Sequence, residues 1–502
     1  MAAGQHLQID TPPKSALNPS HCESSPMSPA EPSRKRVAVI GGGISGLATA
    51  HRLIELDSQL NVTVFEQADR TGGVLDTQLR DGFMLEWGAD NFITTVPWAV
   101  ELCRRIGFED QLIQTDEAHR GAFVVSKGRL RRIPQGFIIM APSRVWPVIT
   151  TPILSPLAKM RMAGEYFVRK REDDSDESLA AFVTRRFGRQ TYDRLVQPLI
   201  GGIYTGDPSK LSLQSTMPRF RDMEKSHGSL IRAVMSQAKK QPKSDRNSSG
   251  GRYSMFVAPR DGISSLVQAI VDRLPADGIR VVSEITGLER QLDGSWHLTV
   301  DAEEQNSEPF DAVVIATPAK SAAQLVADLD ADLSRELSEI HHSGCSIVTL
   351  AYQRSQVTHP LDGFGFVVPA VENRKILSGS FSSVKYPGRA PDGHVLMRVF
   401  IGGALRPELV DLPDEQLTEI AVQELAELLG TRGDPSLVRI ARLPASMPQY
   451  YVGHRQRVSE IRERAASIGG LFLTGNAYDG VGIPFCIKGG ETTAQGVADY
   501  LK

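Results

Sequence analysis

The feature that most constrains the fold is a glycine-rich turn directly after a short apolar run. Residues 36–40 (Arg-Val-Ala-Val-Ile) are typical of a buried parallel strand. Gly41-Gly-Gly-Ile-Ser-Gly46 follows at once, and residues 47–56 have the pattern of a helix. A second apolar run at 61–65 completes a strand–helix–strand unit. This order predicts an α/β domain built around a parallel sheet.

The glycine spacing, G-x-G-x-x-G, also predicts what the turn binds. Gly41 permits the tight turn, Gly43 lets the backbone approach a pyrophosphate, and Gly46 lets the helix pack closely on the sheet. Glu66 ends the second strand, where a carboxylate accepts hydrogen bonds from ribose hydroxyls. A plain glycine turn beside a surface glutamate is the alternative. Because the strand, glycines, helix, second strand and acidic residue all occur at the expected spacing, a dinucleotide site is favoured.

Three further glycine segments favour FAD over NAD. Arg70-Thr-Gly-Gly73 follows Glu66 closely, where many flavoproteins place a second glycine pair. Glu86-Trp-Gly-Ala-Asp-Asn91 offers another position for close approach. Residues 475–484 are glycine-rich and precede the last predicted helix, whose N-terminus would stabilise negative charge on a reduced flavin. Alone, that last segment could be an ordinary strand–helix turn.

Composition limits the other function classes. The chain has 502 residues, enough for two to four domains, and a net charge of −3, which argues against a surface that coats nucleic acid. The four cysteines lie far apart without metal-ligand spacing, so neither a metal site nor a disulfide scaffold is expected. The sequence contains no run of about 18 apolar residues, so no transmembrane helix is predicted. A cytoplasmic location is the resulting expectation.

The predicted domains are discontinuous in sequence. Buried strands at 311–316 and 470–474, with a closing helix at 489–501, would join the N-terminal unit in one α/β domain. The region 96–235 is mostly helical in pattern, and 345–402 contains four β-like runs. An amphipathic helix is expected over 411–429, with Asp411 as its cap and Gly430 as its stop. We predict the following parts: a disordered tail (1–33), a Rossmann-like FAD-binding domain (34–92, 255–320 and 440–502), a helical membrane or substrate-channel domain (93–236), a flexible loop (237–254) and an α+β substrate-binding domain (321–439).

The glycine motifs together resemble the monoamine oxidase/phytoene desaturase flavoprotein superfamily. Within it, three stretches resemble the oxygen-dependent protoporphyrinogen/coproporphyrinogen oxidase family. They are 198–208 (Pro-Leu-Ile-Gly-Gly-Ile-Tyr-Thr-Gly-Asp-Pro), 359–369 (His-Pro-Leu-Asp-Gly-Phe-Gly-Phe-Val-Val-Pro) and 381–403. The resemblance extends from about Arg34 to the C-terminus.

The resemblance implies an FAD site assembled from both ends of the chain. Pyrophosphate, ribose, adenine and isoalloxazine would each contact short segments, and FAD would bind non-covalently because Cys486 does not lie in a recognisable attachment site. The implied FAD residues are Gly41, Gly42, Gly43, Ile44, Ser45, Gly46, Glu66, Gln67, Arg70, Gly72, Gly73, Val74, Gly88, Ala89, Asp90, Asn91, Ile285, Gly475, Asn476, Val481, Gly482 and Ile483.

The substrate side is implied by fewer positions. Gly202 matches a backbone carbonyl position, and Val367 and Phe400 match apolar walls. Ser380 stands where relatives carry Leu, which would make that wall wider or more polar. Arg120 is the nearest match to the family's propionate-binding arginine. No side chain is nominated as a catalytic acid or base.

The activity implied is the six-electron oxidation of a porphyrinogen, in which the flavin N5 accepts hydride and O2 is reduced to H2O2. The primary prediction is protoporphyrinogen IX to protoporphyrin IX in haem biosynthesis. The alternative is coproporphyrinogen III to coproporphyrin III. More distant alternatives are an amine oxidase, a carotenoid desaturase and a flavin-binding scaffold that has lost turnover.

Two remaining stretches concern partners. Residues 133–158 are apolar but interrupted by five prolines and flanked by cations, a pattern that suits peripheral attachment to the inner face of a membrane. The alternative, given equal weight, is that this stretch forms a wall of the substrate channel or part of the ordinary core. The pair His341-His342 is expected on a solvated face, and the acidic run 172–177 to support a helix start. No nucleic-acid partner is expected, and a homodimer is left open.

Overall fold

The structure is a computed structural model that describes residues 34–138, 140–142, 146–240, 256–301 and 309–502. The predicted tail at 1–33 lies outside the described residues. The loop predicted over 237–254 was placed too early at its start, because helix α10 extends to Lys240, and its other residues lie outside the described ones.

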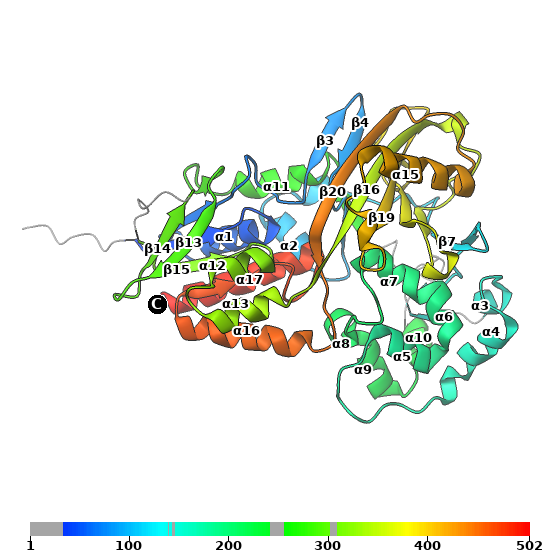
Figure 1. Cartoon of the computed structure of the whole chain (residues 1–502), viewed down its shortest axis with the longest axis horizontal. Helices are drawn as coiled ribbons and strands as arrows, with labels where there is room; N and C mark the ends of the chain where they lie inside the picture. Colours follow the sequence, from blue (N-terminus) through cyan, green and yellow to red (C-terminus); the bar gives the residue numbers. More distant parts are fainter. Residues whose placement is uncertain (1–33, 139, 143–145, 241–255, 302–308) are drawn as a thin grey trace, which may run out of the picture. The chain divides into compact units, whose positions relative to one another are not determined.

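A five-stranded parallel sheet gathers segments from the whole chain (Figure 1). Its order is β12-β2-β1-β15-β21, and each pair of neighbours is parallel. This confirms that strands from both ends of the chain share one sheet. The bounds are β1 (Arg36–Ile40), β2 (Asn61–Phe65), β12 (Ile279–Arg280), β15 (Ala312–Ile315) and β21 (Leu471–Leu473).

Helices cover both faces of this sheet, which is why its central strands are apolar on both sides. On one face, α1 (Ile44–Leu56) and α17 (Ile483–Tyr500) pack against Val37, Val39 and their neighbours. On the other face lie α12 (Ala319–Leu325), α13 (Ala331–Ser338) and α16 (His454–Ile468). The result is a three-layer α/β arrangement.

Helix α17 begins six residues before its predicted start at 489. Gly482 is extended, with φ −83° and ψ 153°, and Pro484 occupies the first turn. Proline suits that position because it lacks the N–H that the first turn leaves unpaired. The glycine-rich segment therefore leads straight into the helix.

A second sheet has seven strands in the order β20-β16-β19-β18-β17-β7-β8. Its pairs are antiparallel except β17 with β7. The four β-like runs predicted within 345–402 are all strands here. The bounds are β7 (Phe123–Ser126), β8 (Arg129–Arg132), β16 (His342–Gln353), β17 (Gly365–Val367), β18 (Ile376–Phe381), β19 (His394–Gly402) and β20 (Leu437–Pro448).

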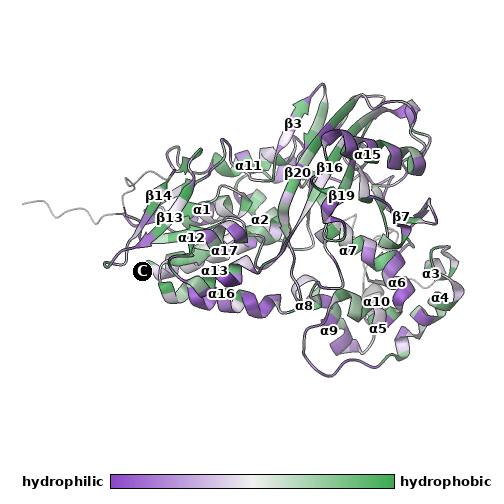
Figure 2. Ribbon diagram, in the orientation of Figure 1, coloured by the Kyte–Doolittle hydropathy of each residue, from purple (hydrophilic) through white to green (hydrophobic). Residues whose placement is uncertain are grey.

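Helix α15 (Asp414–Leu429) covers one face of this sheet with its apolar residues, Leu417 and Leu425 among them. Figure 2 shows hydrophilic and hydrophobic residues side by side along it. The prediction of Asp411 as its cap was wrong, because Pro413 directly precedes the first turn. Gly430 ends it in the left-handed region, with φ 64°, as expected.

The remaining helices form a layer of their own, here called the helical layer (residues 146–240; Figure 1). Its helices are α3 (Trp146–Thr150), α4 (Pro156–Ala163), α5 (Leu179–Phe187), α6 (Arg189–Thr191), α7 (Gln197–Tyr204), α8 (Leu213–Thr216), α9 (Pro218–His227) and α10 (Leu230–Lys240). The predicted helical region 96–235 was too wide. Residues 112–142 contain short strands, because Lys127 and Gly128 both have positive φ and close the β7–β8 hairpin.

The other described elements are short and connect these layers. They are β3 (Thr77–Arg80), β4 (Phe83–Glu86), β5 (Phe92–Ile93), α2 (Trp98–Arg105), β6 (Leu112–Gln114), β9 (Phe137–Ile138), β10 (Ala141–Pro142), β11 (Phe256–Pro259), α11 (Ile263–Val271), β13 (Ile285–Arg290), β14 (Trp296–Val300) and α14 (Ser382–Lys385). Within the described residues, none of the helices is both long and apolar enough to cross a bilayer.

The helical layer is held together by a buried charge network. The Glu224 carboxylate lies 2.6 Å from Arg185, 2.6 Å from Arg221 and 3.3 Å from Arg186. Arg186 also pairs with the fully buried Glu165. The acidic run 172–177 takes part, since Glu177 pairs with Arg185. In the described part of the chain, no group of side chains has the arrangement of a metal site.

Candidate active site

A cavity of about 1310 Å³ opens where four parallel strands end; it is called the main cavity below. The residues that follow β1, β2, β15 and β21 all line it: Gly41, Glu66, Thr317 and Gly475. Ligands of open α/β sheets bind outside the carboxyl ends of the strands. The seven-stranded sheet and the helical layer supply the remaining walls.

The first glycine turn forms a cradle with space in front of it. Gly41 has φ 108°, and a Cβ added to Gly46 would lie 2.0 Å from the Gly41 carbonyl oxygen. A Cβ added to Gly43 would meet no atom of the described residues within 4 Å. Gly41 and Gly46 therefore meet the needs of the fold, whereas Gly43 leaves room for a ligand against the backbone.

Glu66 connects the end of β2 to this turn. Its Oε2 accepts a hydrogen bond from the Gly42 N–H at 2.7 Å, and its Oε1 accepts one from the Ala68 N–H at 2.8 Å. An ionised carboxylate has about four acceptor positions. The two that remain can accept ribose hydroxyls, so the residue fits the role predicted for it.

The second glycine segment, Gly72-Gly73, lies against the first glycine turn. Gly72 has φ 101°, and its N–H donates to the Gly42 carbonyl at 2.8 Å. The Arg70 guanidinium donates to the carbonyls of Gly73 (2.8 Å) and Leu75 (3.2 Å), so it shapes this loop from behind the cavity wall. Gly88 cannot carry a side chain, because its Cβ would lie 2.4 Å from the Val74 carbonyl oxygen.

An ion pair sits in the wall beside Gly88. The Asp90 carboxylate lies 3.6 Å from Arg398 and 4.0 Å from Lys385, and Arg398 donates to the Gly88 carbonyl. Burial by itself would raise the pKa of Asp90, but these cations outweigh it and lower the pKa. Asp90 is therefore ionised and holds the loop 88–91 against β19.

The C-terminal segment completes the site. Gly475 and Gly480 have φ of 137° and 157°, and Gly482 leads into α17. The Asn476 side chain donates to the Ser446 carbonyl at 3.2 Å, which fixes it against β20. Cys486 lines the cavity in the first turns of α17, and burial raises the pKa of its thiol to about 11. This thiol is neutral near pH 7.

Most of the predicted FAD residues line this one cavity. They are Gly41, Gly43, Ile44, Ser45, Glu66, Gln67, Gly72, Gly73, Val74, Gly88, Ala89, Asp90, Asn91, Ile285, Gly475, Asn476, Val481, Gly482 and Ile483. Three others, Gly42, Gly46 and Arg70, are not among the lining residues and contact those that are.

The predicted substrate residues divide in the same way. Gly202 and Phe400 line the cavity. Val367 lies just behind Gly202, whose added Cβ would be 3.5 Å from it, and Ser380 pairs directly with Arg398 in the sheet. Arg120 is not brought to the cavity: its guanidinium donates to Glu117 at 2.7 Å, and it is not a lining residue.

For three residues that line the cavity, the sequence-based predictions were missing or wrong. Arg398 and Arg219 were not considered. His342 was expected on a solvated face, but it is half-buried in the cavity wall, and burial lowers its pKa. Its Nδ1 lies 2.8 Å from the Ile340 carbonyl, while its buried Nε2 has no hydrogen-bond partner among the described residues. For Arg398 and His342 the available sequence signal is a cationic or titratable residue in a strand; Arg219, in helix α9, has no such signal.

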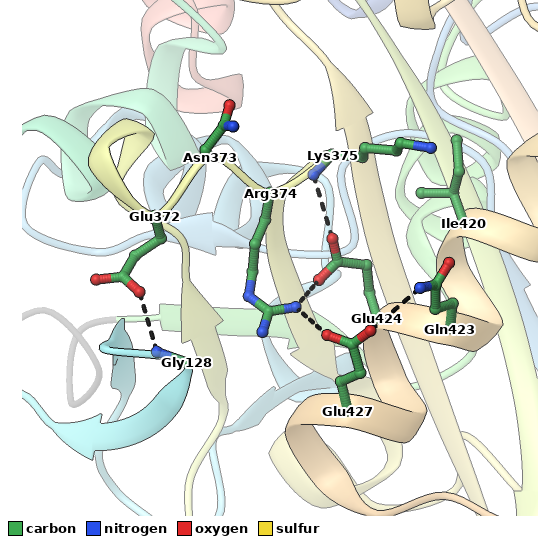
Figure 3. A pocket seen from close by; sticks show the side chains of 9 residues that line it. All are labelled: Gly128, Glu372, Asn373, Arg374, Lys375, Ile420, Gln423, Glu424 and Glu427. Atoms are coloured by element: carbon green, nitrogen blue, oxygen red, sulfur yellow. Dashed lines mark hydrogen bonds and ion pairs between the residues drawn. The ribbon is translucent and has the colours of Figure 1, made fainter.

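A second hollow, of about 400 Å³, lies beside α15 (Figure 3). Arg374 is paired there with Glu424 at 2.6 Å and with Glu427 at 2.9 Å. Glu372 accepts hydrogen bonds from the backbone of Lys127 and Gly128. Because these charges are paired with one another, the hollow offers little to a ligand.

Comparison with known proteins agrees with this geometry. A family model described as flavin containing amine oxidoreductase matches residues 44–498. The chain belongs to this family. The α/β fold and the flavin oxidoreductase class predicted from the sequence are thereby confirmed.

Curated relatives place the chain more narrowly. The coproporphyrinogen III oxidase of Bacillus subtilis (strain 168) is 31% identical over 93% of this chain and 99% of its own. The mitochondrial protoporphyrinogen oxidase of Nicotiana tabacum is 30% identical over 94% of this chain and 96% of its own. These matches confirm the predicted resemblance to the protoporphyrinogen/coproporphyrinogen oxidase family.

Solved structures show the same fold. A protein from Exiguobacterium sp. 255-15, described as a protoporphyrinogen oxidase, superposes with a TM-score of 0.82 at 28% identity, over 93% of this chain and 99% of its own. Reduced UDP-galactopyranose mutase superposes with a TM-score of 0.69 at 15% identity, over 93% of this chain and 96% of its own, which concerns the fold alone.

Proposed function

We propose that this chain is an FAD-dependent oxidase that converts coproporphyrinogen III to coproporphyrin III and reduces O2 to H2O2. Three relatives named coproporphyrinogen III oxidase share 31–32% identity with it, and relatives named protoporphyrinogen oxidase share 27–30%. The predicted alternative is therefore better supported than the primary prediction of protoporphyrinogen IX. The observation that carries the proposal is the convergence of the glycine segments on one cavity.

The cofactor part of the cavity fits FAD. The open space over Gly43 suits a pyrophosphate, Glu66 suits a ribose, and the starts of α1 and α17 both face the cavity. Bound FAD would supply the acceptor for hydride. The neutral thiol of Cys486 is a poor nucleophile, which supports non-covalent binding.

The rest of the cavity suits a porphyrinogen. Its volume of about 1310 Å³ exceeds the roughly 300–1,000 Å³ of ordinary ligand pockets, so a dinucleotide and a macrocycle can share it. Leu199, Ile203, Phe137 and Phe400 make this region apolar. Its walls would orient the macrocycle and exclude water. Within the chain, the helical layer and the seven-stranded sheet supply this substrate-binding part.

The helical layer also supports peripheral membrane contact. The apolar stretch 133–158 divides in the structure: Phe137 lines the cavity, and Ile153 is buried core. Other apolar side chains in this stretch, or shortly after it, are exposed to solvent. Their exposed fractions are 72% for Trp146, 74% for Leu157 and 82% for Phe167. Arg169 and Lys170 are exposed next to them, an arrangement suited to an anionic membrane surface.

Vesicle binding tests this contact. The Trp146→Ser/Phe167→Ser double variant should lose most of its co-sedimentation with phosphatidylglycerol vesicles and keep its turnover. The matched control, Leu292→Ser, removes an exposed leucine from the turn between β13 and β14. Equal sedimentation of all three proteins would rule out the proposed face.

The activity is tested by fluorimetry of the purified holoenzyme. Coproporphyrinogen III and protoporphyrinogen IX are supplied separately in air, and porphyrin fluorescence and H2O2 are followed together. We expect faster turnover of coproporphyrinogen III, with three H2O2 for each porphyrin. Faster turnover of protoporphyrinogen IX would restore the primary prediction. Turnover of a primary amine, with neither porphyrinogen oxidised, would make the chain an amine oxidase.

A further inference from the structure

Of the described residues that line the main cavity, two carry a permanent positive charge: Arg219 and Arg398. Arg398 is compensated, since the Asp90 carboxylate lies 3.6 Å away and the Gly88 carbonyl accepts its hydrogen bond. Arg219 forms neither an ion pair nor a hydrogen bond with any described residue. The cavity thus contains one guanidinium whose donors are free for a ligand.

Arg219 is an exposed residue at the cavity wall that packs against one aromatic neighbour. It lies in the first turn of α9, and its guanidinium carbon sits 4.8 Å from the ring centroid of the buried Phe220. Tyr204 donates a hydrogen bond to the Thr216 carbonyl at 3.1 Å, which anchors the segment leading into α9. Burial lowers the pKa of Arg219, but an arginine guanidinium keeps its charge in proteins.

The surroundings of Arg219 belong to the substrate part of the cavity. Met217, two residues before it, and Tyr204, whose hydroxyl anchors the segment leading into α9, also line the cavity. Phe220 and Met217 pack in the core of the helical layer, which is separate from the core beneath the Gly41–Gly46 turn. A ligand of Arg219 would accordingly be an anionic group of the substrate.

We propose that Arg219 binds a propionate carboxylate of the porphyrinogen and favours the substrate with more of them. The inference rests on the proposed function. Coproporphyrinogen III has four propionates and protoporphyrinogen IX has two, so an extra carboxylate site discriminates between them. A guanidinium suits a carboxylate because it can form two parallel hydrogen bonds. Arg120, the residue predicted for this role, is occupied by Glu117.

The test compares FAD-loaded wild type with Arg219→Gln and Arg219→Lys. Arg455→Gln serves as the matched control, because Arg455 is exposed on α16 and does not line the cavity. Two readouts are taken: steady-state kinetics with each porphyrinogen, and equilibrium binding of coproporphyrin III and of its tetramethyl ester by fluorescence. The ester keeps the macrocycle and removes the four charges.

We expect Arg219→Gln to lower kcat/KM for coproporphyrinogen III by about 10- to 150-fold, mainly through KM, with a smaller loss for protoporphyrinogen IX. Arg219→Lys should recover part of the loss. Ester binding and FAD content should match the control. Unchanged binding of coproporphyrin III by Arg219→Gln, an equal loss for the ester, or a loss of FAD would overturn the proposal.

The binding readout separates this proposal from the proposed function. If wild type oxidises neither porphyrinogen but binds coproporphyrin III in a manner that depends on Arg219, the carboxylate site stands and the oxidase assignment fails. If wild type turns over coproporphyrinogen III and Arg219→Gln does so equally well, the oxidase assignment stands and the Arg219 site fails.

Discussion

A single methyl group at Gly43 would distinguish a cofactor cradle from a structural turn. Gly43 has φ −70° and ψ 173°, which any residue adopts, and an added Cβ would have no atom within 4 Å. Gly43→Ala should therefore leave the unliganded fold intact or stabilise it by about 0.4–1 kcal/mol, through lower entropy of the unfolded chain. Its cost should appear only when FAD binds.

The magnitude follows from the space available. A pyrophosphate held against the Gly43 backbone would have to share that space with the new methyl group, and overpacking of this kind costs about 1–3 kcal/mol. The FAD dissociation constant should rise about 5- to 150-fold. Gly46→Ala behaves differently, because its Cβ would lie 2.0 Å from the Gly41 carbonyl oxygen and would destabilise the fold itself.

The assay measures thermal unfolding of the apoprotein and quenching of FAD fluorescence on titration. Gly164→Ala is the matched control, since Gly164 also has open space around its would-be Cβ but lies in the helical layer. It should keep wild-type FAD affinity. The reasoning is refuted if Gly43→Ala binds FAD as tightly as the control, or if its apoprotein unfolds at a much lower temperature.

Three further predictions concern charge and cofactor attachment. Burial raises the pKa of the Glu86 carboxyl from 4.5 to about 7. Its protonation therefore stabilises the folded state fully below about pH 4.5, and this stabilisation is lost as the pH rises to about 7. In urea unfolding measured across this pH range, Glu86→Gln should lack this fall in the free energy of unfolding. Glu224→Gln leaves buried arginines without their shared carboxylate and should cost about 3–5 kcal/mol in urea unfolding at neutral pH. Acid precipitation of wild type and Cys486→Ser should leave the flavin in the supernatant of both; a yellow wild-type pellet would indicate a covalent bond.

Sequence predicted the parts of this molecule that local chemistry determines. The strand at 36–40, the turn at Gly41–Gly46 and the acid at Glu66 are each specified by a few neighbouring residues, so they could be assigned from one sequence. The apolar runs of β15 and β21 were recognisable for the same reason, because a strand buried on both faces is apolar throughout.

The parts that were missed depend on contacts between distant segments. Nothing near Arg219 in the sequence shows that its guanidinium faces a cavity. The pairing of β7 with β17, more than two hundred residues away, likewise drew residues 123–126 out of a region predicted to be helical. Side-chain partners of this kind become visible only in three dimensions.

The two halves of the cavity owe their properties to different structural requirements. Helices α1 and α17 approach so closely that a Cβ on Gly490 would lie 2.5 Å from the Ser45 carbonyl oxygen. In the part of the chain that the structure describes, no side chain caps the start of either helix. Both N-termini can therefore direct free N–H groups at an anionic or electron-rich ligand, so the cofactor half follows from the parallel sheet itself. The substrate half is built from the long insertions between β2 and β15 and between β15 and β21. The side chains that these insertions contribute to the cavity can change without disturbing the sheet. Preference for one porphyrinogen over another would therefore arise at residues such as Arg219 and not at the glycine turns.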